Sequence, residues 1–114
     1  MSLSNKKCVP CEDPNKSYLL SQDAQTNLLN ELTGWSVDGD GKSISKEYHF
    51  SDFVHALSFV NQVGDVAEGE GHHPDIAIWY NRVRLTLTTH SQGGLTENDF
   101  IVASKIDTIT EALA

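Results

Sequence analysis

The sequence predicts an α+β domain of two layers, a four-stranded antiparallel sheet with helices packed on one face. Two observations predict this class: two pairs of short strand-like segments, and a long amphipathic segment that follows each pair. Strand pairs separated by helices favour an antiparallel sheet that is covered on one side. A third helical segment comes first, so a β-β-α-β-β-α core follows an N-terminal helix. The 114 residues fit one such domain.

Residues 1–20 lack periodicity and are expected to form a flexible N-terminal tail, which leaves 21–114 as the folded domain. The tail contains the two cysteines, Cys8 and Cys11, in the sequence CVPC. A CxxC pair can be half of a zinc site or a redox centre. Zinc needs two further ligands and a thioredoxin-like centre needs a flanking strand and helix, and neither context accompanies this pair. Two reduced thiols are therefore favoured, with metal or redox chemistry as the alternative.

The first helix is predicted to begin after Ser21, which can serve as its N-cap, and to end at Gly34. Its apolar face carries Leu28, Leu29 and Leu32.

The first strand pair surrounds the sequence DGDG at 38–41. Glycine supplies the positive φ that tight turns require, so this sequence predicts a hairpin. After the turn, Ile44, Tyr48 and Phe50 fall on one face of a strand.

The clearest helix is predicted between Ser51, a possible N-cap, and the helix-ending Gly69 and Gly71. Apolar residues recur in it at spacings of three and four, as in a helix with one buried face. The residues of that face are Phe53, Ala56, Leu57, Val60, Val63 and Ala67.

Two strands are expected at 76–80 and 83–90, joined through Asn81 and Arg82. Side chains alternate along the second strand, which places His90 on the side away from the core. The core side carries Val83, Leu85 and Leu87.

The last helix is predicted to begin at Thr96, and Asp99 completes the pattern of a capping box. Its buried face is expected to contain Phe100, Ala103, Ile106, Ile109 and Leu113.

Charge and hydropathy exclude some classes of function. Eight basic and sixteen acidic residues give a net charge of −8, which repels nucleic-acid phosphates. No apolar run approaches the roughly 18 residues of a membrane span. We therefore expect a cytoplasmic protein that binds neither nucleic acid nor membrane directly.

Histidines dominate the candidate chemistry. His72 and His73 are adjacent, and Pro74 biases His73 toward an extended conformation, so the two imidazoles should point to opposite sides. Glu68 lies at a helix C-terminus, where an acidic group opposes the macrodipole, so it is a candidate for orienting an imidazole. Solvated loop histidines and a carboxylate kept for solubility are the alternative.

Other chemistries fit less well. Adjacent histidines suit a catalytic zinc site poorly, and the sequence has neither a GxSxG nucleophile motif nor a phosphate-binding loop. Acid–base catalysis by imidazoles without a metal or cofactor remains, since imidazole titrates near neutral pH.

The pattern formed by these residues resembles the pterin-4a-carbinolamine dehydratases, a family also known as the dimerization cofactor of a homeodomain transcription factor. The resemblance covers roughly residues 21–114. It rests on Glu68, His72-His73-Pro74, Tyr80, His90 and Asp99, and on Gly34-Trp35, THSQGGLTENDF and ASKID. At three positions, Gly71, Ile76 and Asn98, the chain departs from the animal members.

The resemblance implies dehydration of 4a-hydroxytetrahydrobiopterin to quinonoid dihydropterin plus water, in tetrahydrobiopterin recycling. It implies that His73 is the main general acid and base, and that His72 and His90 bind the pterin and share in proton transfer. Asp99 has a competing structural role in the capping box. The implied substrate-binding residues are Glu68, Gly71, Pro74, Thr88, Thr89, Ser91 and Asp99.

The resemblance further implies a homodimer or homotetramer and a functional link to an aromatic amino-acid hydroxylase. A non-catalytic dimerisation or assembly module on the same fold is the alternative function. A metal-dependent hydrolase is a third and weaker interpretation.

Overall fold

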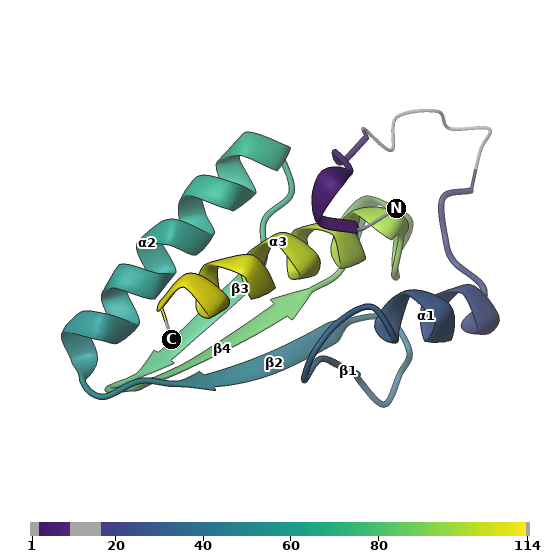
Figure 1. The fold of residues 1–114 in the computed structure, drawn as a ribbon. Coiled ribbons are helices and arrows are strands. Elements are labelled where there is room, and N and C mark those ends of the chain that lie inside the picture. Colours follow the sequence, from purple (N-terminus) through teal and green to yellow (C-terminus); the bar gives the residue numbers. More distant parts are fainter. Residues whose placement is uncertain (1–2, 10–16, 114) are drawn as a thin grey trace.

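The computed structural model describes residues 3–9 and 17–113. Four strands form one antiparallel sheet in the order β1-β2-β4-β3, and α2 and α3 lie across one of its faces (Figure 1). This arrangement confirms the predicted fold class. The elements are the 3-10 helix η1 (Leu3–Asn5), α1 (Gln22–Leu29), β1 (Ser36–Val37), β2 (Ile44–His49), α2 (Phe53–Glu70), β3 (Asp75–Trp79), β4 (Arg82–Leu87), the 3-10 helix η2 (His90–Gln92) and α3 (Glu97–Leu113).

Strand β4 lies in the middle of the sheet and pairs with β2 on one side and β3 on the other. The three residues predicted on its core side, Val83, Leu85 and Leu87, are fully buried. The side chains of β4 alternate between exposed and buried because the helices cover only one face of the sheet. Strands β1 and β3 form the two edges of the sheet.

Helix α2 follows the prediction in extent but differs at its start and on its buried face. Asp52, and not Ser51, is the N-cap, and its carboxylate accepts a hydrogen bond from the His55 N–H at 2.8 Å. Phe53 and Leu57 were expected to be buried, yet 45% and 38% of their surface is exposed. The residues that are buried are Ala56, Phe59, Val63 and Ala67.

The buried face of α2 is turned toward Phe59 because that ring packs on the aromatic residues of the first strand pair. The ring centroid of Phe59 lies 4.6 Å from that of Tyr48 and 5.1 Å from that of Phe50. Leu57 is displaced from Ala56 by about 100° around the helix, on the opposite side from Phe59. Leu57 therefore lies at the edge of the contact between α2 and the sheet.

The second strand pair is shifted by one residue from the prediction, and its turn consists of Tyr80 and Asn81. Tyr80 adopts a positive φ of 49°. Strand β4 ends at Leu87, three residues before the expected end, and Thr89 makes only an isolated bridge to Gly94. His90 belongs to η2, so the alternation of the strand does not determine where its side chain points.

One half of the predicted capping box of α3 is present, since the Asp99 side chain caps the Thr96 N–H, whereas the Thr96 hydroxyl bonds Thr89 and not the Asp99 N–H. The Thr96 N–H donates to the Asp99 carboxylate at 2.9 Å, and the Asp99 N–H donates to the Thr96 carbonyl at 3.2 Å. Phe100, Ala103 and Ile106 are fully buried as expected. The side chain of the predicted core residue Leu113 lies outside the described residues.

Ile101 and Val102 are also buried, although they lie off the predicted face of α3. In the same core cluster, η1 contacts α3 and contributes Leu3, with 2% of its surface exposed. Residues 3–9 thus differ from the unstructured tail expected there, because they form a short helix and pack against the domain.

Helix α1 begins as predicted, with the Ser21 hydroxyl accepting from the Ala24 N–H at 3.2 Å. It ends at Leu29, earlier than the expected stop at Gly34. Leu32 therefore follows the helix, but like Leu28 and Leu29 it is partly buried against the core.

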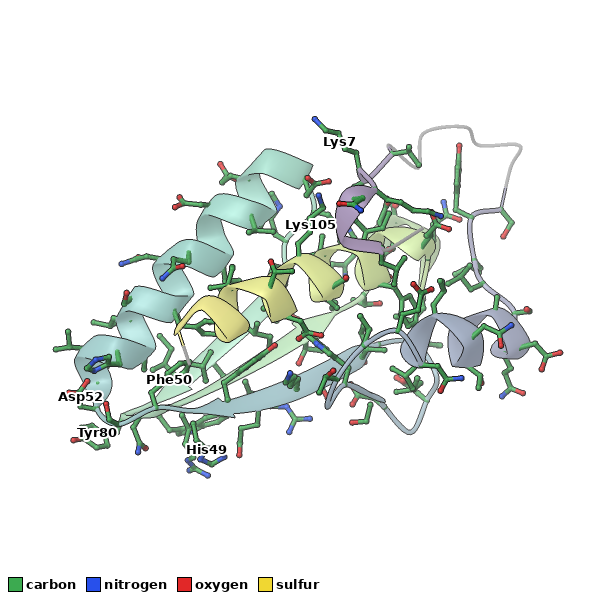
Figure 2. The ribbon with its side chains drawn as sticks, in the orientation of Figure 1. Lys7, His49, Phe50, Asp52, Tyr80 and Lys105 are labelled. Atoms are coloured by element: carbon green, nitrogen blue, oxygen red, sulfur yellow. The ribbon has the colours of Figure 1, made fainter. Side chains whose placement is uncertain are left out.

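Both polar and apolar side chains project from the surface (Figure 2). His49 points away from the helices, and its side chain is 62% exposed, as expected for a solvated histidine. His55, with a side chain that is 65% exposed, pairs with Asp52. Within the parts of the chain that the structure describes, no helix combines the length and the apolar character needed to span a membrane.

Candidate active site

The predicted site residues lie where α2 ends, β3 begins, and the segment after β4 leads into α3. Gly71 ends α2 in the left-handed conformation, with φ of 65°. Its N–H and the N–H of His72 both donate to the carbonyl of Ala67. A residue with a Cβ adopts this conformation at a cost, which accounts for glycine at this position. The turn sends His72 toward α3 immediately after the helix.

His72 binds the carboxylate of Asp99. The Nε2 atom of His72 lies 2.6 Å from Oδ1 of Asp99, and the exposed fractions of the two side chains are 13% and 0%. Because a carboxylate only accepts hydrogen bonds, Nε2 is the donor. The ring is therefore held by one nitrogen, and Nδ1 is the atom that remains for other chemistry.

The second oxygen of Asp99 has two further donors. Oδ2 accepts from the Thr89 hydroxyl at 2.9 Å and from the Thr96 N–H at 2.9 Å. Since Thr89 uses its proton on Asp99, the Thr96 hydroxyl donates to the Thr89 oxygen at 2.8 Å. The same carboxylate thus caps α3 and holds His72.

His73 pairs with a different carboxylate, that of Glu68 on the last turns of α2. This pair lies at the surface, with 58% of the His73 side chain and 78% of the Glu68 side chain exposed. The two adjacent imidazoles therefore have unlike environments. One is fixed on a buried carboxylate, and the other contacts solvent beside an exposed one.

His90 and Ser91 lie exposed in η2, directly after the buried Thr89. The loop is closed by the Thr89 N–H, which donates to the Gly94 carbonyl at 3.0 Å. Gly93, with φ of 70°, ends η2. Because Thr89 binds Asp99, the loop that carries His90 is attached to the carboxylate that holds His72.

The remaining predicted substrate-binding residues have different surroundings. The Thr88 hydroxyl donates to the Lys42 carbonyl at 2.5 Å, so it contacts the loop between β1 and β2 and not a histidine. Pro74 is half-buried and Gly71 is exposed. The contacts therefore connect His72, Asp99 and Thr89 directly.

Two residues that the sequence did not single out for the site flank this network. Glu70 accepts a hydrogen bond from the Cys8 N–H at 2.8 Å and forms an ion pair with Lys105 at 3.4 Å. Asn98 bonds Val9 through both ends of its amide. No local pattern reveals these contacts, because they join residues 62 and 89 positions apart.

The environment of these contacts alters two titrating groups. The Cys8 N–H holds the pKa of Glu70 below its ordinary value. Burial, reinforced by the Glu70 charge, raises the pKa of the Cys8 thiol to about 12. Cys8 is a free cysteine, whereas Cys11 lies outside the described residues. Residues 3–9 and 17–113 contain no group of three or more His, Cys, Asp or Glu side chains arranged to hold a metal ion.

Comparison with known proteins identifies the family of the chain. The family model for pterin 4 alpha carbinolamine dehydratase matches residues 18–109. The chain belongs to the pterin 4 alpha carbinolamine dehydratase family. A protein of Nitrosospira multiformis, assigned provisionally to these dehydratases by its name, is 45% identical over 107 residues, which are 94% of this chain and 91% of that protein.

Solved structures of dehydratase-like proteins share the fold. A transcriptional coactivator/pterin dehydratase from Brucella melitensis superposes with a TM-score of 0.76 at 37% identity, over 79% of this chain and 96% of that one. A pterin dehydratase-like protein described as a RuBisCO assembly factor in the alpha-carboxysome has a TM-score of 0.58 at 22% identity, over 68% of this chain and 89% of that one. The second likeness concerns the fold alone.

Proposed function

We propose that this chain dehydrates a 4a-hydroxytetrahydropterin, in the biological case 4a-hydroxytetrahydrobiopterin, to the quinonoid dihydropterin. Membership of the dehydratase family supports the proposal. The observation that carries it is the placement of adjacent imidazoles on two carboxylates, His72 on Asp99 and His73 on Glu68. Such a site has a fixed imidazole and an accessible imidazole within one residue of each other.

The reaction requires an acid and a base and no change of redox state. The C4a–O bond breaks, and an acid gives the leaving hydroxide a proton, which makes water. A base takes the proton from N5–H, and the electron pair of that bond forms the C4a=N5 double bond. One proton enters and one leaves, so imidazoles that titrate near neutral pH can perform both steps.

In this proposal His73 is the main general acid and base. Its side chain is 58% exposed, so a pterin arriving from solvent can reach the ring. Glu68 pairs with the ring and orients it. When it is protonated, the ring is the proton donor which the leaving hydroxyl needs.

His72 and His90 are proposed to bind the pterin and to share in proton transfer. Asp99 fixes the His72 ring through Nε2, which leaves Nδ1 as the atom for the substrate. Thr89 connects Asp99 to the loop of His90. The buried carboxylate of Asp99 therefore contacts the His72 ring directly and the His90 loop through Thr89. The other residues proposed to shape or contact the substrate are Glu68, Gly71, Pro74, Thr88 and Ser91.

The proposed biological setting is the recycling of tetrahydrobiopterin after an aromatic amino-acid hydroxylase has used it. In that setting the chain acts as a homodimer or homotetramer. Two exposed apolar regions support self-association. They are Phe53, Val54 and Leu57 on α2, and Ile76, Ile78 and Trp79 on the edge strand β3. An open edge of this kind is a template for pairing with another strand.

A second candidate function is a non-catalytic dimerisation or assembly module. The observation in its favour is the shared fold of the protein described as a RuBisCO assembly factor. The same exposed apolar regions would serve this function. It gives no reason for His73 and Glu68 to pair at the surface, and we therefore place it second.

The test is a stopped-flow assay of 4a-hydroxytetrahydropterin dehydration with the wild type and His73→Ala. We expect the wild type to exceed the spontaneous rate and the variant to lose about two orders of magnitude, the usual scale of acid–base catalysis. His49→Ala, which changes an exposed histidine on the open face of the sheet, is the control and should be nearly silent. A folded wild-type protein without any acceleration would favour the assembly module.

A further inference from the structure

The described N-terminal segment, Leu3–Val9, runs across the end of the domain that carries the candidate site, and we name it the N-terminal strap. Its first residues form η1, which contacts α3, and Leu3 is buried in the core. Figure 2 shows Lys7 at the upper end of the molecule, close to the last turn of α2. An exposed ion pair at 3.4 Å joins Lys6 to Glu97 on α3.

The strap is attached to the start of α3 through Asn98. The Val9 N–H donates to Oδ1 of Asn98 at 3.0 Å, and Nδ2 of Asn98 donates to the Val9 carbonyl at 2.7 Å. The Cys8 thiol donates to the Asn98 carbonyl at 3.6 Å. Asn98 is itself buried whereas Val9 is exposed, so these contacts are partly shielded from competing water.

The strap is attached to the end of α2 through Glu70. The Cys8 N–H donates to Oε1 of Glu70 at 2.8 Å, and Lys105 of α3 lies 3.4 Å from Oε2. Only 12% of the Glu70 side chain is exposed. One carboxylate therefore joins the strap, α2 and α3 at a single point.

The two attachment points flank the buried pair of the candidate site. Asn98 immediately precedes Asp99, and Glu70 comes two residues before His72. The 2.6 Å contact between His72 and Asp99 requires a fixed separation between the end of α2 and the start of α3. The strap is fastened to both of these ends and so constrains that separation.

We propose that Glu70 and Asn98 are positioning residues through which the N-terminal strap holds the His72 ring against Asp99. This inference rests on the proposed function for its kinetic consequence. Neither residue has to touch the pterin, because each acts through its neighbour in the pair. A small displacement of a catalytic ring is enough to slow a reaction that depends on orientation.

The kinetic test compares Glu70→Ala and Asn98→Ala with the wild type in the dehydration assay. We expect kcat to fall about tenfold in each variant, with KM changed far less, since orientation is lost and not affinity alone. Glu70→Gln keeps an acceptor for the Cys8 N–H but loses the charge that pairs with Lys105, and should recover part of the loss. Asp65→Ala, at an exposed position of α2, is the matched control and should leave kcat unchanged.

A second readout does not depend on turnover. We would follow the ring signals of His72 by ¹⁵N-edited NMR, assigned by their disappearance in His72→Gln. Reaction of Cys8 with an alkylating agent, measured in a Cys11→Ser background, reports whether the strap is docked, since burial suppresses the thiolate. Both variants should move the His72 signals and speed the alkylation, while circular dichroism stays that of a folded protein.

The two readouts separate failure of the inference from failure of the proposed function. A wild type without dehydratase activity would end the proposed function, while displaced His72 signals in both variants would still support the strap. Wild-type His72 signals in Glu70→Ala and Asn98→Ala would overturn the inference, whatever happens to kcat. An equal loss of kcat in Asp65→Ala would overturn it as well.

Discussion

Nε2 of His72 lies 2.6 Å from Oδ1 of Asp99, a carboxylate with no exposure to solvent. This carboxylate has three donors, and the imidazole is one of them. Removing a donor from a buried charge leaves part of the cost of its burial uncompensated.

Replacing His72 by alanine should destabilise the fold, whereas replacing His73 should not. We expect His72→Ala to lower the free energy of unfolding by about 3 kcal/mol, because Asp99 loses a buried partner. His73→Ala removes an exposed side chain and should stay within about 0.5 kcal/mol of the wild type. Urea unfolding of the two variants measures the difference, and equal costs would contradict the assignment of His72 to a buried pair.

Two glycines at the end of α2 should respond in opposite directions to the same substitution. Gly71 has a φ of 65°, so Gly71→Ala should cost about 1 kcal/mol. Gly69 lies within the helix, and Gly69→Ala should stabilise by about 0.5 kcal/mol because alanine is the better helix former. A Cβ at either position meets nothing within 4 Å, so packing does not contribute. Thermal unfolding of both variants is the measurement, and shifts of the same sign would refute the explanation.

Asp107 of α3 should be a second stabilising carboxylate, at a distance from the candidate site. It accepts from the Trp35 indole N–H at 3.0 Å, from the Thr33 N–H at 3.3 Å and from Lys46 at 3.2 Å. We expect Asp107→Ala to cost about 2 kcal/mol in urea unfolding, since the buried indole N–H loses its acceptor. Asp107→Asn retains an acceptor oxygen for Trp35 and should cost less. An alanine variant as stable as the wild type would show that these contacts contribute nothing net.

Attachment of the strap at Glu70 should weaken in acid. The pKa of Glu70 lies below its ordinary value of 4.5, chiefly because of the Cys8 N–H and further because of Lys105. Because folding lowers this pKa, the contribution of ionised Glu70 to attachment of the strap is complete above about pH 4.5. It is lost as the pH falls through the pKa of Glu70 in the folded protein. Below the pKa of Glu70 in the folded state, the strap should detach more readily and expose Cys8. In the Cys11→Ser background, the reaction of Cys8 with dithiodipyridine, which proceeds in acid, should therefore become faster below that pKa.

The matched control for this pH dependence is Glu70→Gln, which cannot ionise but still accepts from the Cys8 N–H. Its Cys8 reaction should show no acceleration between about pH 5 and pH 3. Circular dichroism at each pH would separate release of the strap from unfolding of the domain. The same acceleration in the glutamine variant would mean that another group controls the strap.

The sequence predicted the elements whose signals are local. The alternation of Val83, Leu85 and Leu87 identified the core side of β4, and the spacing of Thr96 and Asp99 identified the start of α3. Both signals span a few residues and arise from the geometry of one element. The prediction failed at Leu57, because the position of Phe59 against the sheet, and not the helical period alone, decides which arc is buried.

The rest of the site depends on contacts that no local pattern encodes. The bonds of Cys8 to Glu70 and of Val9 to Asn98 span 62 and 89 positions. The sequence does not reveal such contacts, and because the N-terminal residues show no periodicity they were expected to form a tail. The pairing of His72 with Asp99 spans 27 positions and was not assigned beforehand. The sequence proposed candidate residues for the site, but the partners of these residues could be seen only in the fold.

The double use of Asp99 has a consequence for how members of this fold diverge. Because one carboxylate both starts α3 and holds His72, selection for a stable domain is enough to preserve that pair, whether or not any chemistry is performed. The exposed pair of His73 and Glu68 makes no comparable contribution to the stability of the domain. Under the proposed function, a lineage that abandons the reaction is therefore expected to lose the exposed pair first, and His73 with Glu68 would be the better marker of an active relative.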